Sequence, residues 1–230
     1  MQTMKLKIIE KREEVNNCFS LILEKPDGFF FYPGQFLDIE LDAKVTDGRG
    51  KVRAFTIASS PTENFLMVTS QKGISDYKKY MENLKPGDSI SASHPAGTFI
   101  LDENEPAVFL AGGIGITPFR SMLKYAVDNN LTTSITLIYS NSSDNFLFRD
   151  ELHIWQKQLK DIRIYYVSTK KEGRLNKNSL ELLINRKSLI INPIYYIAGS
   201  QSMIYDFSKS LAELGVDETN IRTDAFDGYD

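Results

Sequence analysis

A glycine-rich segment at residues 112–118 has the composition of a turn that binds phosphate. It reads GGIGITP, follows an apolar run that predicts a buried strand, and precedes a run that predicts a helix. Glycines let the backbone approach a pyrophosphate closely, and the free N–H groups of a helix N-terminus favour its negative charge. From Gly113 the spacing is G-x-G-x-x-P, with Pro118 in place of the last glycine of the dinucleotide fingerprint. We interpret the segment as a dinucleotide-binding turn; a plain tight strand-to-helix connection is the alternative.

The ends of the next two predicted strands bear on which nicotinamide nucleotide this turn would hold. Domains that bind NAD commonly have an acid at the end of the second strand, where it bonds the ribose 2′-hydroxyl. Here that strand ends in YSNSS at residues 139–143, which includes Ser140, and Asp144 comes only later. The third strand is followed by side chains that suit a 2′-phosphate, namely Ser168, Lys170, Lys171 and Arg174. The pattern leans toward NADPH over NADH, and a solvated surface turn explains the lysines equally well.

A second group of candidates lies in the first half, at Arg53-Ala54-Phe55-Thr56. Arg53 opens an otherwise apolar strand, and its guanidinium can grip a phosphate with two hydrogen bonds. Phe55 and Thr56 are successive residues of one strand, and their side chains point to its opposite faces. The segment therefore offers an aromatic ring and a hydroxyl at neighbouring positions. From these residues alone, a surface arginine and a core phenylalanine explain the segment at least as well.

Gly73-Ile74-Ser75 is a second possible anion site, because a glycine and a helix N-cap stand together there. Plain capping of the helix predicted over residues 75–84 is the alternative.

Several other chemistries lack the residues they need. His94 and His153 stand far apart without an HExxH motif, so no metal site is predicted, and neither a G-x-S-x-G elbow nor a P-loop is present. Cys18 is the only cysteine, which excludes a disulfide framework and a cysteine-ligated iron–sulfur cluster; we expect it to be a small core residue. A net charge of −3, from 27 basic and 30 acidic residues, gives no indication of nucleic acid as a partner.

The elements that would position these residues differ between the two halves. Residues 5–100 contain six short β-like runs separated by Pro- and Gly-containing turns, which predict an antiparallel barrel or sandwich. After residue 105, five strands alternate with four helices, which predicts a parallel sheet covered by helices; Thr117 is the expected N-cap of the first helix, with Pro118 at its first position. An acidic, Pro-containing link at residues 102–106 divides the chain into predicted domains at 1–102 and 103–230.

The beginning of the sequence, MQTMKLKIIEKREE, lacks the apolar region of a signal peptide, and no run of 18 apolar residues occurs in the chain. We therefore expect a cytoplasmic protein without membrane insertion. The oligomeric state stays open.

Taken in order, these motifs resemble those of the ferredoxin–NADP reductase family, which pairs an FAD-binding barrel with a nicotinamide-binding domain. The resemblance runs from about residue 5 to residue 229. It is carried by PGQF at 33–36, RAFT at 53–56, IASSP at 57–61, GIS at 73–75, HPAGTF at 94–99, AGGIGITP at 111–118, YYIAGS at 195–200 and DAF at 224–226.

The resemblance implies a role for each matching residue. Arg53 and Ala54, with Gly73, Ile74 and Ser75, would bind the FAD pyrophosphate; Phe55 would stack near the flavin and Thr56 would bond its reactive edge. Phe226, or less favourably Tyr229, would cover the opposite face of the ring until nicotinamide displaces it. The implied residues for NADP or NAD are Gly112, Gly113, Gly115, Thr117, Pro118, Ser140, Ser168, Lys170, Arg174 and Gly199.

The chain departs from the family pattern at two positions. Phe55 replaces the usual tyrosine, so stacking survives but the phenol hydrogen bond does not. Ala198 stands where many members have a cysteine near the nicotinamide, which puts the efficiency of hydride transfer in doubt.

The resemblance therefore implies an FAD-dependent oxidoreductase that takes hydride from NAD(P)H and passes electrons to an external acceptor. A ferredoxin-like or flavodoxin-like protein, or an oxygenase component, would be such an acceptor. A flavin or ferric-chelate reductase with a diffusible acceptor is one alternative, and a catalytically quiet flavin-binding electron-transfer subunit is another.

Overall fold

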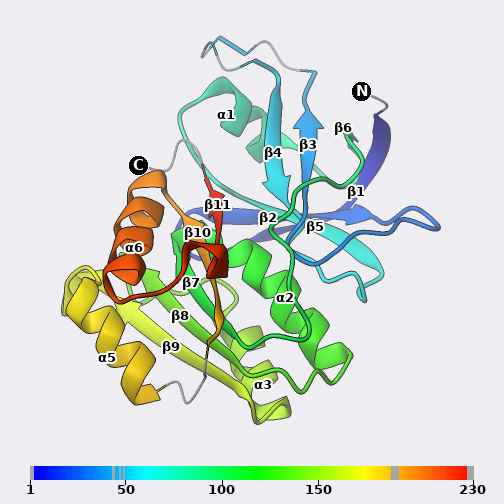
Figure 1. Ribbon diagram of the computed structural model, residues 1–230. Helices are drawn as coiled ribbons and strands as arrows, with labels where there is room; N and C mark the ends of the chain where they lie inside the picture. Colours follow the sequence, from blue (N-terminus) through cyan, green and yellow to red (C-terminus); the bar gives the residue numbers. More distant parts are fainter. Residues whose placement is uncertain (1–2, 43–44, 47, 49, 188–191, 227–230) are drawn as a thin grey trace.

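Two β-sheets of different kinds organise the chain, one in each half of the sequence (Figure 1). The computed structural model describes residues 3–42, 45–46, 48, 50–187 and 192–226. The first sheet has six antiparallel strands in the order β4-β3-β6-β1-β2-β5, and the second has five parallel strands in the order β11-β10-β7-β8-β9. The predicted fold class, a six-stranded barrel followed by an α/β domain with a five-stranded parallel sheet, is confirmed.

The first sheet encloses an apolar core because its strands alternate inward and outward side chains. Leu6, Ile8, Phe19 and Leu21 belong to this core, together with Tyr77 of the single helix on this side. The elements are β1 (Met4–Glu13), β2 (Cys18–Glu24), β3 (Phe36–Glu40), β4 (Val52–Thr56), β5 (Phe65–Gln71), α1 (Asp76–Asn83) and β6 (Ser89–Ala92). Ser75 is the N-cap of α1, as predicted, and its hydroxyl accepts a hydrogen bond from the backbone N–H of Lys78.

The second sheet is covered by helices on both faces. Its elements are β7 (Ala107–Gly112), η1 (Gly113–Gly115), α2 (Ile116–Asp128), β8 (Ile135–Asn141), α3 (Arg149–Gln158), β9 (Ile162–Ser168), α4 (Thr169–Glu172), α5 (Lys177–Lys187), β10 (Ile194–Gly199), α6 (Gln201–Glu213), η2 (Glu218–Asn220) and β11 (Ile221–Ala225). Helices α2 and α3 lie on one face and α5 and α6 on the other (Figure 1). Within the described residues, none of these helices is long and apolar enough to cross a membrane.

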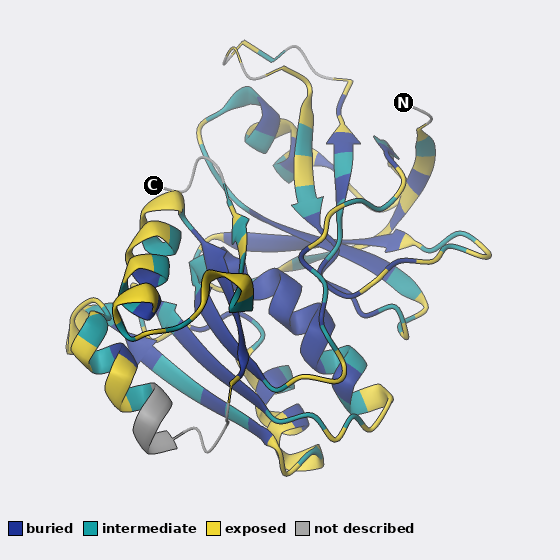
Figure 2. Ribbon diagram, in the orientation of Figure 1, coloured by how far each residue is buried: buried dark blue, intermediate teal, exposed yellow. Residues whose placement is uncertain are grey.

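The two sheets meet through the outer face of β2 and β5. Phe19 and Leu21 point into the barrel core, so Ser20 and Ile22 point away from it, toward the second half. Helix α2 fills the space on that side and is buried over most of its surface (Figure 2). Cys18 of β2 packs into the core of the parallel sheet, as do Phe99 and Leu101. The division of the chain at residue 102 stays a prediction.

The predicted start of α2 was wrong in its detail. The helix begins at Ile116, one residue before Thr117, and its N-cap is Gly115, which has no side chain to cap it. The η1 turn runs directly into α2, so Thr117 lies inside the first helical turn, where its hydroxyl donates to the carbonyl of Ile114 at 3.1 Å. Pro118 is the third helical residue instead of the first, and it is tolerated because N–H groups of the first turn have no partner within the helix.

Two further local differences follow from packing. The sequence pattern FLFRDELHIWQKQL predicts a helix over residues 146–159, but α3 begins only at Arg149, because Phe146 and Leu147 are buried in the core. The chain turns at Phe148, which adopts a left-handed conformation with φ of 60°. The short helix α4, directly after β9, was not predicted.

Arg120 of α2 is the most deeply buried charged residue that joins the two halves. Its guanidinium is 1% exposed and donates to Glu63 at 2.9 Å and to Glu151 at 2.6 Å. It also donates to the carbonyl of Ala58 at 2.9 Å. Glu63 and Ala58 belong to the barrel half, whereas Arg120 itself belongs to the parallel-sheet half. The Arg120 side chain therefore bonds the two halves to each other.

We expect Arg120→Ala to lower the free energy of unfolding by about 3–5 kcal/mol, because it leaves two carboxylates without their buried partner. Urea denaturation measures the change. Arg12→Ala is the control: Arg12 and its partner Glu10 are roughly half exposed, so the loss should stay below about 1 kcal/mol. Equal losses in the two variants would contradict the role of Arg120.

Candidate functional site

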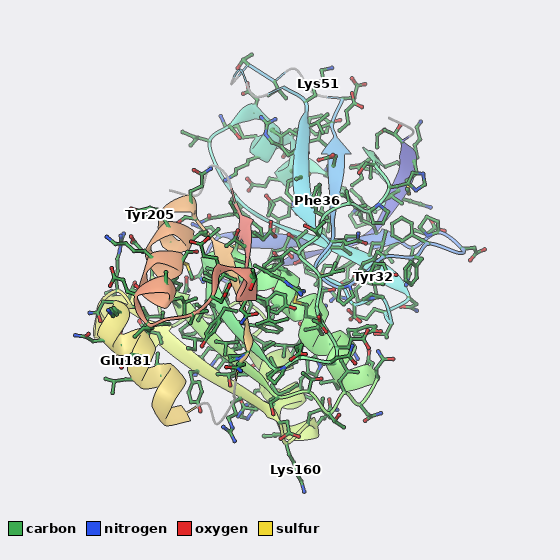
Figure 3. The ribbon with its side chains drawn as sticks, viewed as in Figure 1. Tyr32, Phe36, Lys51, Lys160, Glu181 and Tyr205 are labelled. Carbon is green, nitrogen blue, oxygen red and sulfur yellow. The ribbon has the colours of Figure 1, made fainter. Side chains whose placement is uncertain are left out.

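A cavity of about 450 Å³ lies where the barrel meets the parallel sheet, and we call it the first cavity. One wall is β4, and Phe36 of β3, labelled in Figure 3, extends it. The opposite wall comes from η1, α2 and the end of β11. Its lining residues are Phe36, Val52, Arg53, Ala54, Phe55, Thr56, Thr69, Ser70, Ser75, Tyr77, Lys78, Ile114, Thr117, Asp224, Ala225 and Phe226. The structure therefore brings together most residues that the sequence predicts for FAD.

Arg53 is held in a fixed position at the edge of the first cavity. Its guanidinium donates to the carbonyls of Gly50 at 2.7 Å and Val52 at 2.8 Å. It also lies over the ring of Tyr77, 5.0 Å from the ring centre, in a cation–π contact. These contacts leave an oriented cation beside the N-terminus of α1.

Tyr77 is a functional candidate that sequence reasoning missed. Its ring stacks on Phe55 with the centres 6.1 Å apart and an angle of 16° between the planes. Its hydroxyl donates to the carbonyl of Ile39 at 2.8 Å, which anchors the ring to β3. Tyr77 therefore supports both Phe55 and Arg53. Its place one residue inside α1 was a signal, but the contact joins two elements that are distant in sequence.

Only one residue of the predicted GIS segment, residues 73–75, lines the first cavity. Ser75 lines it, but Gly73 and Ile74 do not, and the side chain of Ile74 is 92% exposed. Gly73 lies against the side chain of Lys78, so its lack of a side chain lets that lysine fold over the start of α1.

The lining residues fit FAD. Arg53, Lys78 and Ser75, the N-cap of α1, all line the cavity, and two cations beside a helix N-terminus suit a pyrophosphate. Phe55 and Phe226 offer ring faces to a flat aromatic system, and Thr56 adds a hydroxyl.

A second cavity, of about 310 Å³, opens along the carboxyl ends of the parallel strands. It is lined by Asn16, Cys18, Gln71, Gly112, Gly113, Ile114, Tyr139, Ser140, Asn141, Ser142, Leu147, Thr169, Gly199, Ser200, Met203 and Phe226. Gly112 and Gly199 end the neighbouring strands β7 and β10, between which the chain order of the sheet reverses. Dinucleotides bind at this point in doubly wound sheets.

The glycine-rich turn is fixed by close packing and by one phenol. A Cβ on Gly115 would collide with the carbonyl of Ala198, so only glycine lets η1 lie this close to β10. Gly113 has a positive φ of 53°, and its carbonyl accepts a hydrogen bond from the Tyr139 hydroxyl at 2.9 Å. The turn thus has one defined conformation. Gly115 shapes the site from behind, and Pro118 is buried in α2; neither lines the second cavity.

Two residues line both cavities, and they form the wall between them. Ile114 comes from η1, and Phe226 follows β11. The backbone N–H of Phe226 donates to the carbonyl of Gly199 at 2.9 Å, which holds it beside the glycine-rich turn. Thr117, predicted for the nicotinamide nucleotide, lines the first cavity instead of the second, because it lies within the first turn of α2. Tyr229, the weaker alternative to Phe226, lies outside the described residues.

The structure does not assemble the basic cluster that the sequence suggested for a 2′-phosphate. Lys170 and Arg174 are exposed and, like buried Ser168, do not line the second cavity. Lys171 forms an ion pair with Asp144 at 2.5 Å, which also lowers the pKa of that carboxyl. The described lining of the second cavity contains no lysine or arginine, although Ser140 lies in it as predicted.

Ala198 is fully buried and packs into the core of the parallel sheet. Its side chain is part of neither cavity lining.

Asp224 is a second candidate without a predicted role. It pairs with Ala198 in the β10–β11 register and lines the first cavity. Burial raises the pKa of its carboxyl from 3.8 to about 6. The signal in the sequence was a carboxylate two residues before Phe226. What makes it chemically useful is its burial, which only the assembled structure reveals.

The fold pairs an antiparallel sheet with a parallel one, and the two cavities share part of their lining. Residues 109–209 match the family described as the oxidoreductase NAD-binding domain. This segment is thus similar to NAD-binding domains of oxidoreductases, and the chain as a whole shares its fold with ferredoxin–NADP⁺ reductases.

Individual relatives extend this similarity over most of the chain. Flavohemoprotein A of Dictyostelium discoideum is 28% identical over 235 residues, covering 94% of this chain and 58% of that protein. The glycine betaine monooxygenase reductase subunit of Pseudomonas aeruginosa is 26% identical over 227 residues, covering 89% and 61%. The ferredoxin–NADP⁺ reductase of Plasmodium falciparum shares the fold, with a TM-score of 0.78 at 23% identity over 98% of this chain and 97% of that one. The chain spans about 60% of the length of these two curated relatives.

We expect Asp224→Asn to stabilise the cofactor-free chain at pH 8 by up to about 3 kcal/mol, since a rise of about two pKa units costs roughly that much when the carboxyl is charged. The raised pKa means that the folded state prefers the protonated acid. The penalty therefore grows as pH rises from about 4 through 6 and is absent below 4. Urea denaturation at pH 4 and pH 8 measures the difference.

Asp217→Asn is the matched control. Hydrogen bonds from Thr219 lower the pKa of Asp217, so removing its charge should give no gain at pH 8. A gain for Asp224→Asn of the same size at both pH values would contradict the assigned pKa.

Proposed function

We propose that this chain is an FAD-dependent oxidoreductase that takes hydride from a nicotinamide nucleotide and passes electrons to a separate acceptor. In this proposal residues 1–102 bind FAD and residues 103–230 bind the nucleotide. The observation that carries it is the wall shared by the two cavities, Ile114 and Phe226. Displacing one aromatic side chain would bring the two ligands into contact, and proximity of this kind supplies much of the rate of hydride transfer.

The chain's own residues bind and orient the two ligands. Arg53 and the N-terminus of α1 hold the FAD pyrophosphate, while Phe55, backed by Tyr77, supports the ring system. The Thr56 hydroxyl bonds the reacting edge, and Phe226 occupies the nicotinamide position until the nucleotide arrives. FAD, when bound, accepts two electrons as hydride and can release them one at a time.

The backbone of the glycine-rich turn holds the nucleotide. Gly112 and Gly113 approach its pyrophosphate at the N-terminus of η1 and α2, with Gly199 on the opposite side. Ala198 lines neither cavity, so the absent thiol leaves the lining of both intact. This favours an active enzyme over a quiet flavin-binding subunit.

We propose NADH as the preferred nucleotide, against the lean of the sequence pattern toward NADPH. Hydroxyl and amide groups of Ser140, Asn141 and Ser142 line the second cavity and suit a ribose. A 2′-phosphate would find no cation in the described lining, and Lys171 is already paired with Asp144.

The acceptor is proposed to be a protein redox partner, such as an oxygenase component or a ferredoxin-like or flavodoxin-like protein. The similarity to a monooxygenase reductase subunit supports a partner of this kind. A diffusible acceptor, free flavin or a ferric chelate, is the alternative that a panel of acceptors would distinguish.

We expect Arg53→Ala to weaken FAD binding about 10- to 100-fold, the usual effect of losing a hydrogen bond to a charged group. The FAD content of the purified protein and a titration of the cofactor-free chain measure it. Phe226→Ser is the control; it should retain FAD and change nicotinamide binding instead. Normal FAD occupancy in Arg53→Ala would refute the role of Arg53.

We expect NADH to bleach the bound flavin at least about 10-fold more efficiently than NADPH in anaerobic stopped-flow mixing, because the second cavity offers a 2′-phosphate no charged partner. Thr169→Lys places a cation on the wall of the second cavity and should lower the ratio of NADH efficiency to NADPH efficiency. Lys170→Ala removes an exposed cation and should leave it unchanged. A selective loss of NADPH use in Lys170→Ala would support the predicted 2′-phosphate site at Lys170 and contradict the preference for NADH. Failure of both nucleotides to bleach the flavin would refute the proposed function.

A further inference from the structure

Three side chains between the surface and the first cavity form a continuous line of hydrogen bonds. The hydroxyl of Ser20 donates to the carboxylate of Glu14 at 2.8 Å. The same hydroxyl lies 2.9 Å from that of Thr69, which donates to it while Ser20 donates to Glu14. Ser20 is fully buried and Thr69 is 5% exposed.

The line follows from strand register. Ser20 of β2 and Thr69 of β5 are directly paired, and both point away from the barrel core toward the parallel-sheet half. On the same face the pair Ile22 and Met67 is apolar. The two hydroxyls therefore form a narrow polar path beside apolar neighbours.

The two ends of this line of hydrogen bonds lie in the linings of two different cavities. Thr69 lines the first cavity, where we place FAD. Glu14 lines a third cavity of about 430 Å³, at the surface between β1 and the start of α3, where Arg149 and Asp150 are exposed. Water in the third cavity thus has access to Glu14, and the Ser20 and Thr69 hydroxyls connect Glu14 to the first cavity.

The surroundings of Glu14 let it hold a proton. Burial raises the pKa of its carboxyl, and Glu151 of α3 raises it further. The Ser20 hydrogen bond, Arg12 of β1 and Arg120 of α2 act in the opposite direction. Asp144 and the exposed Arg149 and Asp150 are the other charged groups around the third cavity.

We propose that Glu14, Ser20 and Thr69 form a proton relay that carries protons from solvent to the flavin site. This inference rests on the proposed function. Reduction of FAD by NADH, written NADH + H⁺ + FAD → NAD⁺ + FADH₂, takes one hydrogen as hydride from the nicotinamide and one proton from water.

Each transfer moves one proton and leaves the chain as it was. The Glu14 carboxyl gives its proton to Ser20, Ser20 gives its own to Thr69, and Thr69 gives its own to the first cavity. Glu14 then regains a proton from water in the third cavity. Hydroxyl groups suit this relay because each can donate one hydrogen bond and accept another. The donor and acceptor in each hydrogen bond can therefore exchange when Glu14 gains or loses its proton.

The first experiment uses the FAD-loaded protein in anaerobic stopped-flow mixing with NADH, with a pH indicator in weakly buffered solution. Flavin bleaching and proton uptake are recorded together for wild type, Ser20→Ala and Glu14→Gln. Ser121→Ala is the matched control, because this buried hydroxyl donates across the same interface to the carbonyl of Ser59 at 2.6 Å but lies outside the line. We expect proton uptake to slow at least about 10-fold in both relay variants and to stay synchronous with bleaching in the control.

The second experiment follows the Glu14 carboxyl by NMR titration of the cofactor-free chain. Ser20→Ala should raise the Glu14 pKa, because the hydrogen bond it removes favours the charged form. Thr69→Val should also shift it, although Thr69 reaches Glu14 only through Ser20, whereas Ser121→Ala should not. Glu14 is only partly buried and Glu14→Gln keeps the size of its side chain, so this variant reports on the relay even if Ser20→Ala folds poorly.

Proton uptake at the wild-type rate in Ser20→Ala and Glu14→Gln would overturn the relay alone, with the proposed function intact. An unshifted Glu14 pKa in Thr69→Val would also overturn it. A wild-type protein that binds FAD but is not reduced by either nucleotide would refute the proposed function, and the relay with it.

Discussion

The burial of the Arg120 guanidinium is the interaction on which the arrangement of the two halves depends. A buried charge of this kind is stable only when its hydrogen-bonding groups are matched, and here Glu63, Glu151 and the Ala58 carbonyl match them. Two of these partners belong to the barrel half, and Glu151 belongs to α3. The geometry that satisfies one guanidinium therefore also fixes the distance between the sheets. Both cavities are lined by residues from both halves, so they depend on this arrangement.

The shared wall also depends on chain connections within the parallel sheet. The chain order reverses between β7 and β10, which leaves their carboxyl ends side by side. Gly115 fits against Ala198 at this point, and Phe226 leaves β11 beside Gly199. A barrel docked on this edge places its β4 residues opposite the nucleotide turn. The site is thus built from the ends of elements, and the strands themselves serve as a rigid support.

The sequence allowed good prediction where the information was local. Strand alternation and glycine turns indicated both sheets. The order of the motifs placed Arg53 and Thr56 in one predicted site, and both residues line the first cavity. Prediction failed where a property arises from contact between distant elements. The value of Asp224 comes from its burial, and the supporting role of Tyr77 comes from stacking on another strand. The predicted role of Lys170 stays a prediction, and the residue does not line the second cavity, because spacing along the chain does not tell which cations reach a cavity.

The buried state of Cys18 has a practical consequence for studying the motions of this protein. It is the only cysteine in the sequence, its side chain is 5% exposed, and burial raises the pKa of its thiol to about 11. Because the thiolate is the reactive form, this thiol resists maleimide dyes and spin labels near neutral pH. A cysteine introduced at an exposed position, such as Lys160 or Tyr205 (Figure 3), would then be labelled selectively in the native protein without removing Cys18.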